Sequence, residues 1–215
     1  GYQEENGRAI IEDLKEDYPG MDFSIAVNRE YLSTGTLASL LIGYETIPHK
    51  NEPLLVIEGD LVCDNEIIEK IVPAAENTLA VDCSKVVDEE AMRFISQGGV
   101  IKSISKEIKL KDAQGEFIGI SKLSGKDFPT FYKIGQKLLE KEKDLFYESV
   151  MDKLAKEQNK ISFKILNIEP YRWTEIDFPL EYKKAREIFT KDVKISLFSG
   201  IIFIFLLIFS RSCLV

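Results

Sequence analysis

A chain of 215 residues, of which 45% are apolar and 30% charged, is long enough for one domain with a substantial core. Its formal net charge of −8 argues against nucleic acid as a partner, although an acidic chain can still bind nucleotides where Mg²⁺ supplies positive charge. The cysteines lack C-x-x-C spacing and the single histidine, His49, follows a proline in a polar loop. Neither a zinc site nor a Ser-His-Asp triad is therefore indicated.

The first third of the chain predicts two helices and two strands. "ENGRAIIEDLKEDY" carries apolar residues at helical spacing, and "DFSIAVN" predicts a short strand from Phe23 to Val27. "STGTLASLLIGYETI" predicts a helix with Ser33 or Thr34 as its N-cap. "LLVIE" is apolar without alternation, which is typical of a strand in a sheet that is covered on both faces.

The remaining two thirds alternate strands with helices. "NEIIEKIV" predicts a helix, "TLAVDCS" a strand, and "EAMRFIS" with "VIKSISKEIKL" a hairpin that turns at Gly98-Gly99. "GEFIGISKLS" predicts another strand, followed by helices over roughly 127–139 and 142–157. "ISFKILN" predicts a further strand, and "PLEYKKAREIFTKD" an amphipathic helix.

This order of elements predicts an α/β domain over residues 1–190, built on an open, mixed, mostly parallel sheet flanked by helices. Ligands of such sheets bind at the carboxyl ends of the strands. Asn28 ends the predicted strand "SIAVN" and Asp60 follows "LLVIE", so we expect both side chains at that edge of the sheet.

Two acidic segments stand at the ends of predicted elements. Glu58 and Asp60 flank a glycine after the buried strand, and Glu175 and Asp177 follow Trp173 before the last amphipathic helix. Each segment has a plain interpretation, an acidic turn in the first case and an N-cap in the second. The alternative is that the two segments meet to form one metal site.

Five segments in a fixed order bear on this choice. They are "GYQEE", "NREYLSTGTLASL", "VIEGDLV", "GEFIGISKLS" and "WTEIDFPLEYKKA". On these segments the chain from Gly1 to Ala185 resembles the nucleotidyltransferase superfamily that activates small phosphorylated alcohols and sugars. It is most similar to the branch of phosphocholine, aminoethylphosphonate and inositol-phosphate cytidylyltransferases, and the resemblance implies their nucleotide-diphospho-sugar transferase-like fold.

The resemblance also implies an activity. A phosphate or phosphonate oxygen of the acceptor attacks the α-phosphorus of a nucleoside triphosphate, with CTP favoured, and pyrophosphate leaves. Mg²⁺ is the implied cofactor, with Asp60 and Asp177 as its ligands, because Mg²⁺ takes few hard oxygen ligands from the protein and the rest from phosphates and water. Glu58 and Glu175 would lie beside the ligands or face solvent.

The resemblance also places substrate-binding residues, each with a plainer alternative. Asn28, Thr34, Thr36 and Ser39 would contact nucleotide or acceptor, partly through a helix N-terminus. Gly119 would let a ligand approach the backbone, although a glycine in a strand can simply mark a bulge. Trp173 would line a choline-like pocket by cation–π contact, although a single tryptophan belongs to the core more often.

The sequence departs from the family pattern at two places. Gly35 stands where related sequences often have asparagine, which puts the choice of base and acceptor in doubt. The glycine-rich loop that holds the triphosphate has no counterpart before "GYQEE". We therefore expect an N-terminally truncated domain that lacks its first strands, leaves the edges of their neighbours unpaired, and is inactive by itself.

The C-terminal segment is strongly apolar. Residues 195–210 predict a helix, of which the apolar part would reach roughly 22 Å, short of the ~30 Å core of a bilayer. Basic residues precede it: Lys183, Lys184, Arg186, Lys191 and Lys194. We expect a membrane-anchoring helix that holds the domain on the cytoplasmic side. A buried core helix and an accidental extension are the alternatives.

Two functions from different classes fit these features. The first is a nucleotidyltransferase that binds a nucleoside triphosphate and a small phosphorylated acceptor, as part of a longer protein. The second is a membrane-tethered binding module that has lost its triphosphate loop and does no chemistry. Reading the coding sequence upstream of Gly1 for a Gly-x-Gly-x-Arg stretch would separate them.

Overall fold

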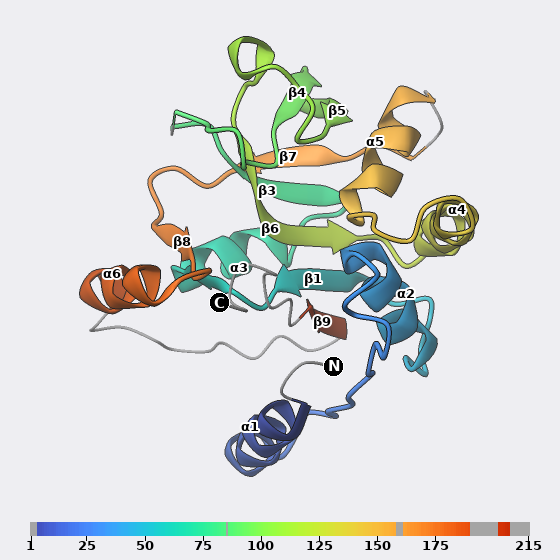
Figure 1. Ribbon diagram of the computed structural model, residues 1–215, viewed down its shortest axis with the longest axis vertical. Coiled ribbons are helices and arrows are strands. Elements are labelled where there is room, and N and C mark those ends of the chain that lie inside the picture. The colour runs from blue at the N-terminus through green and yellow to red at the C-terminus, as the bar shows by residue number, and fades with distance from the viewer. Residues whose placement is uncertain (1–3, 85, 158–160, 190–201, 207–215) are drawn as a thin grey trace.

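The structure is a computed structural model, which describes residues 4–84, 86–157 and 161–189, and the backbone of 202–206. A seven-stranded sheet lies at its centre (Figure 1). In spatial order the strands are β4 (Phe94–Gln97), β5 (Val100–Ile104), β7 (Lys164–Asn167), β3 (Thr78–Asp82), β6 (Glu116–Leu123), β1 (Leu54–Glu58) and β9 (Ile202–Leu206). A separate two-stranded sheet pairs β2 (Leu61–Cys63) with β8 (Trp173–Glu175).

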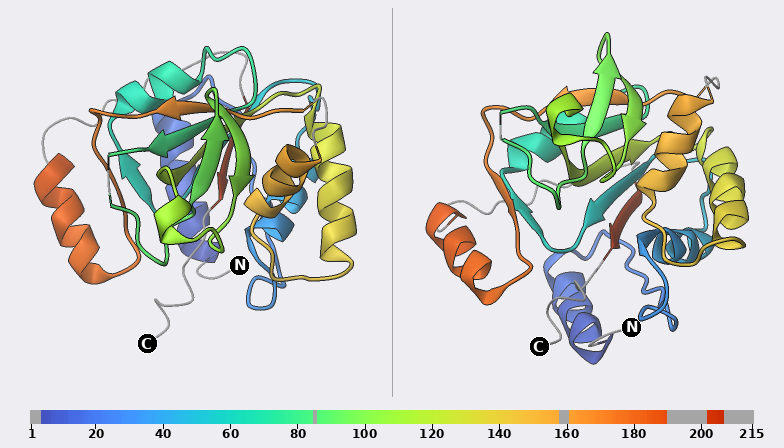
Figure 2. Two further views of the ribbon diagram at one scale, coloured as in Figure 1. Left: turned by 90° about the horizontal axis from the view of Figure 1, so that it is seen from above. Right: turned by 45° about the horizontal axis from the view of Figure 1, so that its top comes forward.

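Helices cover both faces of the large sheet (Figure 2). The helical elements are α1 (Glu4–Asp17), α2 (Thr36–Glu45), α3 (Asn65–Ile71), the 3₁₀ turn η1 (Leu110–Asp112), α4 (Phe128–Leu139), α5 (Glu148–Lys156) and α6 (Pro179–Phe189). The α2, α4 and α5 helices pack on one face, whereas α3 packs on the other.

The strand directions confirm the predicted mixed sheet. The β1 strand pairs parallel with β9 and antiparallel with β6, and β3 pairs parallel with β7 and antiparallel with β6. Hence β1, β3, β7 and β9 run in one direction, as does β4, which forms an antiparallel hairpin with β5. The β5 and β6 strands run the opposite way.

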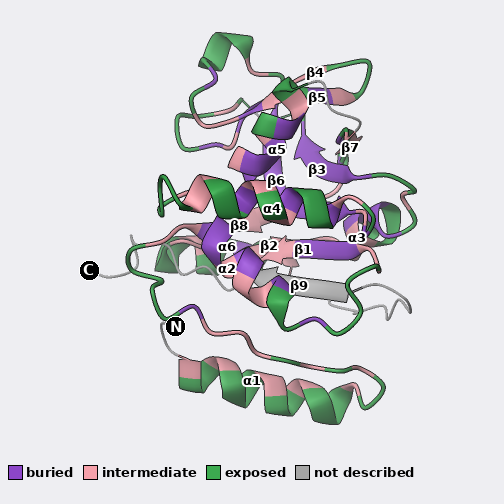
Figure 3. Cartoon of the chain, turned by 90° about the vertical axis from the view of Figure 1, so that its right-hand side faces the viewer, coloured by how far each residue is buried: buried purple, intermediate pink, exposed green. Residues whose placement is uncertain are grey.

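The core follows from the apolar strands. Leu54 and Val56 of β1 face the cluster formed by α2, α4 and α5, whereas Leu55 faces the cluster that contains α3. All five residues of β3 are buried. The β1 strand, which is apolar on both sides, therefore lies in the middle layer of a three-layer domain, as the lack of alternation in "LLVIE" predicted. Figure 3 shows this buried centre, with α1 lying exposed below it.

The local turn signals were partly informative. Gly98 and Gly99 have φ angles of 59° and 75°, so the predicted hairpin turn is confirmed. The strand predicted from Phe23 to Val27 is wrong, because that segment pairs with no strand in the described part of the chain. The N-cap of α2 is Gly35 rather than the predicted hydroxyl residue.

The C-terminal segment differs from its prediction where the structure describes it. Residues 202–206 form β9, parallel to β1, instead of part of an apolar helix over 195–210. A short run of isoleucine and phenylalanine suits a buried strand as well as a helix, and periodicity does not separate the two. The rest of the predicted helix lies outside the described residues. None of the helices in the described ranges has the length and apolar character needed to cross a membrane.

Candidate active site

Two separated acidic segments meet at the carboxyl end of β1. The chain leaves β1 at Glu58, turns through Asp60 and continues as β2, which pairs antiparallel with β8. In this ladder Leu61 lies opposite Glu175, and the Ile176 amide donates a hydrogen bond to the Asp60 carbonyl oxygen at 2.8 Å. The ladder places Asp60 beside the segment from Glu175 to Asp177, which lies more than a hundred positions later in the sequence.

The Asp60 carboxylate is suited to bind a cation. Its Oδ1 atom is buried and has no hydrogen-bond partner among the described residues. Burial, with a further contribution from the negative charge of Asp177, raises the pKa of Asp60 to about 6, although its own backbone amide opposes the shift. A buried carboxylate oxygen without a partner is costly, and a divalent cation would supply the missing interaction.

Three glutamates extend this acidic cluster. Burial raises the pKa of Glu58 well above its usual value, and the charges of Glu148, Asp60 and Glu175 raise it further. Burial likewise raises the pKa of Glu148 and of Glu175, each to about 7. The positive charge of Lys106 opposes all three shifts. The cluster is therefore an electronegative site that favours bound cations or protons.

The cluster does not by itself form a complete metal cage. Within the described ranges, no group of three or more His, Cys, Asp or Glu side chains is arranged to hold a metal ion. Mg²⁺ often binds through one or two carboxylates and takes its other ligands from phosphates and water. The pair Asp60 and Asp177 fits that coordination, and its role as the metal site remains a prediction.

The start of the last helix is capped by another residue. The backbone amides of Asp177 and Phe178 both donate to the Glu181 carboxylate, at 2.8 and 3.0 Å. Pro179 begins α6, as the sequence predicted. Glu181 thus reaches back to amides at the start of its own helix, as the acid of a capping box does. The roles of the Asp177 carboxylate as a cap or as a metal ligand both remain predictions.

The polar residues predicted near the base and acceptor form one network. The Asn28 side-chain amide donates to the Thr34 hydroxyl at 2.9 Å and to the Ser39 hydroxyl at 3.0 Å. The Thr36 hydroxyl accepts from the amide of Tyr147 at 3.0 Å. These contacts fix the loop before α2 to that helix and fix α2 to the start of α5. The structure thus brings Asn28 and Thr34 of the loop together with Ser39 of α2.

Gly119 lies directly against the Glu58 side chain. Its φ angle is +80°, and a Cβ atom built there would lie 3.1 Å from the Glu58 Cβ, Cδ and Oε2 atoms. The pairing of β3 with β6 is irregular between Leu79 and Val81, opposite this part of β6. The glycine therefore lies at a strand irregularity and leaves room for the Glu58 carboxylate.

Trp173 is part of the core. It is 8% exposed, packs in the cluster that contains α3, and its Nε1 donates to Asp82 at 2.7 Å. This environment corresponds to the core alternative for a single tryptophan rather than to an open aromatic pocket.

Sequence reasoning missed two buried residues next to this site. Tyr147 is fully buried and Glu148 is 3% exposed, at the junction of the α4–α5 loop and α5. Glu148 stands one turn before Met151, on the apolar side of an amphipathic helix. That position was the available signal, because an acid at an apolar helical position becomes buried, and a glutamate is almost never fully buried unless it is paired.

Comparison with solved structures assigns the fold. The chain is similar to the inositol-1-phosphate CTP transferase from T. maritima, with a TM-score of 0.68, 18% identity, and coverage of 87% of this chain and 75% of that chain. It is also similar to the CTP:phosphocholine cytidylyltransferase from Streptococcus pneumoniae, with a TM-score of 0.57, 18% identity, and coverage of 84% and 74%. UDP-glucose pyrophosphorylase complexed with UDP-glucose matches with a TM-score of 0.52, 16% identity, and coverage of 74% and 63%. The fold is therefore that of the nucleotidyltransferases.

The sequence itself assigns the family. Residues 1–188 match the model of a domain of unknown function (DUF6564), and the chain belongs to that family. No curated protein matches the chain.

Proposed function

We propose that this domain transfers a nucleotidyl group, most favourably CMP from CTP, to a small phosphorylated or phosphonate alcohol or to a sugar phosphate. The observation that carries the proposal is the β2–β8 ladder, which brings Asp60 beside Asp177 at the carboxyl end of β1. The fold shared with two CTP-using enzymes supports the choice of nucleotide.

The proposed reaction is a displacement at phosphorus. An oxygen of the acceptor phosphate attacks the α-phosphorus of the triphosphate, and the bond from that phosphorus to the bridging oxygen breaks as pyrophosphate leaves. Bound Mg²⁺ would neutralise the phosphate charges. Asp60 and Asp177 would hold the Mg²⁺ ion, and the carboxylates of the cluster around Glu58 would orient these two side chains.

The test is pyrophosphate release with CTP, UTP or GTP and with phosphocholine, aminoethylphosphonate or sugar phosphates as acceptors. The assay compares the 215-residue chain with the protein that the natural reading frame containing it encodes. The 215 residues hold no glycine-rich triphosphate loop, so we expect little turnover from this chain by itself and more from a reading frame that supplies such a loop. Replacing Asp60 or Asp177 with asparagine should lower turnover by roughly 10²-fold or more.

Asp13→Asn in exposed α1 is the matched control, because it makes the same chemical change far from the cluster. Its turnover should equal that of the wild type. Wild-type turnover in both aspartate variants would refute the metal-binding roles. Nucleotide binding without turnover by the protein of the natural reading frame would favour a binding module instead.

A further inference from the structure

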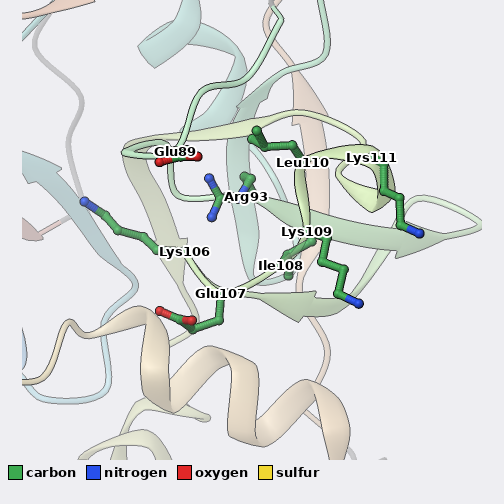
Figure 4. A pocket seen from close by; sticks show the side chains of 8 residues that line it. All are labelled: Glu89, Arg93, Lys106, Glu107, Ile108, Lys109, Leu110 and Lys111. Carbon is green, nitrogen blue, oxygen red and sulfur yellow. The ribbon is translucent and has the colours of Figure 1, made fainter.

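A pocket of ≈ 550 Å³ lies between the segment before β4 and the turn after β5 (Figure 4). Its lining residues are Glu89, Arg93, Lys106, Glu107, Ile108, Lys109, Leu110 and Lys111. The pocket is broadly open to solvent, and its volume is within the usual range for small-molecule sites. Four of these residues are cationic and two are anionic, although the chain as a whole has a net charge of −8. Positive charge is therefore concentrated here against the overall balance.

Arg93 is the central residue of this pocket. It is 6% exposed, and its Nη1 donates to the Asp88 carbonyl oxygen at 2.5 Å. Its Nε is buried and has no hydrogen-bond partner, and within the described residues no carboxylate forms an ion pair with it. Glu89 lines the same pocket, and Figure 4 shows its carboxylate on the side of the guanidinium, without an ion pair between them. The buried Nε–H without an acceptor is costly, so the environment favours a further acceptor such as a phosphate oxygen.

The backbone around Arg93 is held on both sides. Its carbonyl oxygen accepts from the Ser105 amide at 2.9 Å, and it forms a β-bridge with Glu116. The Asp88 side chain accepts from the amides of Glu90 and Ala91, which orders the preceding turn. The backbone at Arg93 and the turn at Asp88 are therefore both held by hydrogen bonds, and the Nη1 bond to the Asp88 carbonyl oxygen connects the guanidinium to that turn.

The three lysines surround Arg93 on flexible stems. Figure 4 shows all three ammonium groups directed away from the Arg93 guanidinium, that of Lys106 on one side and those of Lys109 and Lys111 on the other. Lys106 lies 4.0 Å from the exposed Glu90 carboxylate and 5.2 Å from the centre of the Phe146 ring. None of these contacts is strong enough to fix a lysine, so each ammonium group can turn toward a bound anion.

We propose that this pocket binds the phosphate group of a small phosphorylated molecule. A guanidinium can donate two parallel hydrogen bonds to phosphate oxygens, and the three lysines add positive charge. The pocket therefore suits phosphate better than a halide. Lys106 also acts electrostatically on Glu58, Glu148 and Glu175, so the pocket adjoins the carboxylate cluster. The inference does not depend on the proposed function, because binding is measured without turnover.

The experiment titrates the 215-residue chain with inorganic phosphate, pyrophosphate or glycerol phosphate, and with sodium chloride at matched ionic strength. Binding is followed by the NMR signal of the Arg93 Nε–H and by thermal shift. We expect saturable shifts with the phosphates and none with chloride. Tighter binding of glycerol phosphate would identify a phosphomonoester as the source of the group. Tighter binding of pyrophosphate would identify a diphosphate as the source.

Variants test the assignment to this pocket. Arg93→Lys keeps the charge but loses the fork, and should weaken phosphate binding by about tenfold. The double variant Lys109→Ala/Lys111→Ala alters only exposed side chains, so it should fold and still weaken binding. Lys137→Ala, on exposed α4 surface, is the control for a lost charge. Absence of saturation in the wild type, or equal affinity in the double variant and the control, would overturn the proposal.

Discussion

Packing explains why glycine stands at position 35, where related sequences often have asparagine. A Cβ atom at this position would lie 2.3 Å from the Leu145 carbonyl oxygen and 2.6 Å from its carbon. The Gly35 amide donates to the Lys143 carbonyl oxygen at 3.1 Å, and the Leu37 amide donates to Leu145 at 3.0 Å. The backbone before α5 thus lies directly against the start of α2, and only glycine leaves that space.

Gly35→Ala should therefore destabilise the domain by about 1–3 kcal/mol, the usual cost of overpacking. Gly20→Ala is the control, because a Cβ atom there meets nothing within 4 Å. Urea unfolding of both variants and of the wild type measures their free energies of unfolding. Equal stability of Gly35→Ala and the wild type would show that the two segments separate at no cost.

Glu148 should make stability depend on pH. Its pKa is about 7 in the folded protein, raised mainly by burial, against an ordinary value of 4.5. Between these two values Glu148 binds more protons in the folded state than in the unfolded state. The contribution of this group to stability is therefore greatest below about pH 4.5 and is lost as the pH rises through about 7. The contribution of this one group is on the order of 1–3 kcal/mol.

Glu148→Gln removes this titration, and the loss of stability from pH 5 to pH 8 should become smaller. Other buried acids such as Glu58 still titrate, so the dependence is reduced rather than abolished. Urea unfolding at both pH values gives the measurement. Glu142→Gln, an exposed change of the same kind, should behave as the wild type. An identical pH dependence in Glu148→Gln would contradict the assignment.

At the level of elements, β1 is paired along both edges. The sequence led us to expect unpaired edges beside the missing strands, but β1 has no such edge, because Leu54 to Glu58 pair in register with residues 202–206 of β9. A buried apolar strand with a free edge is a template for association with other chains. The pairing of β9 therefore protects the β1 strand, which also carries the acidic site.

Ending the chain after residue 189 should expose the β1 edge and promote aggregation, together with lower stability. Ending it after residue 206 keeps β9 and serves as the control. Size-exclusion chromatography with light scattering, together with urea unfolding, compares the two shortened chains. Equal monomer content and stability would show that β9 contributes nothing to the sheet.

Most long elements could be predicted from the sequence because their patterns extend over many residues. The helices α2 and α4 and the strands β1, β3 and β6 follow from apolar spacing and turn residues. The three-residue strands β2 and β8 are too short to show a period, although they create the site. The strand predicted at Phe23 to Val27 failed because an alternating pattern forms a strand only where a neighbouring edge exists.

At the level of the whole molecule, the site depends on distant contacts. Asp60 was predicted because it follows an apolar strand, and Asp177 because its segment resembles the closing segment of the nucleotidyltransferases. The β2–β8 pairing accounts for the proximity of the two segments. Glu148 and Arg93 were missed, because their burial results from the packing of α5 and of the β4–β5 region. Spacing along the chain does not show which loop will cover a polar residue.

Burial is also distributed unevenly over the molecule. The α1 helix has no buried residue over its 14 positions, whereas every residue of β3 is buried at the centre of the sheet. An isolated helix of this length is only marginally stable in water, because propensity and surface ion pairs such as Arg8 with Glu4 contribute little. We therefore expect α1 to unfold locally without the rest of the domain.

Native-state hydrogen exchange followed by mass spectrometry tests this expectation. Amides of residues 4–17 should exchange orders of magnitude faster than those of residues 78–82, and mild denaturant should leave the fast exchange unchanged, because local opening exposes little surface. The α4 helix, whose Phe128 and Phe131 are buried, is the matched control and should exchange slowly. If α1 and α4 exchanged at the same rate, α1 would have to be an integral part of the cooperative core.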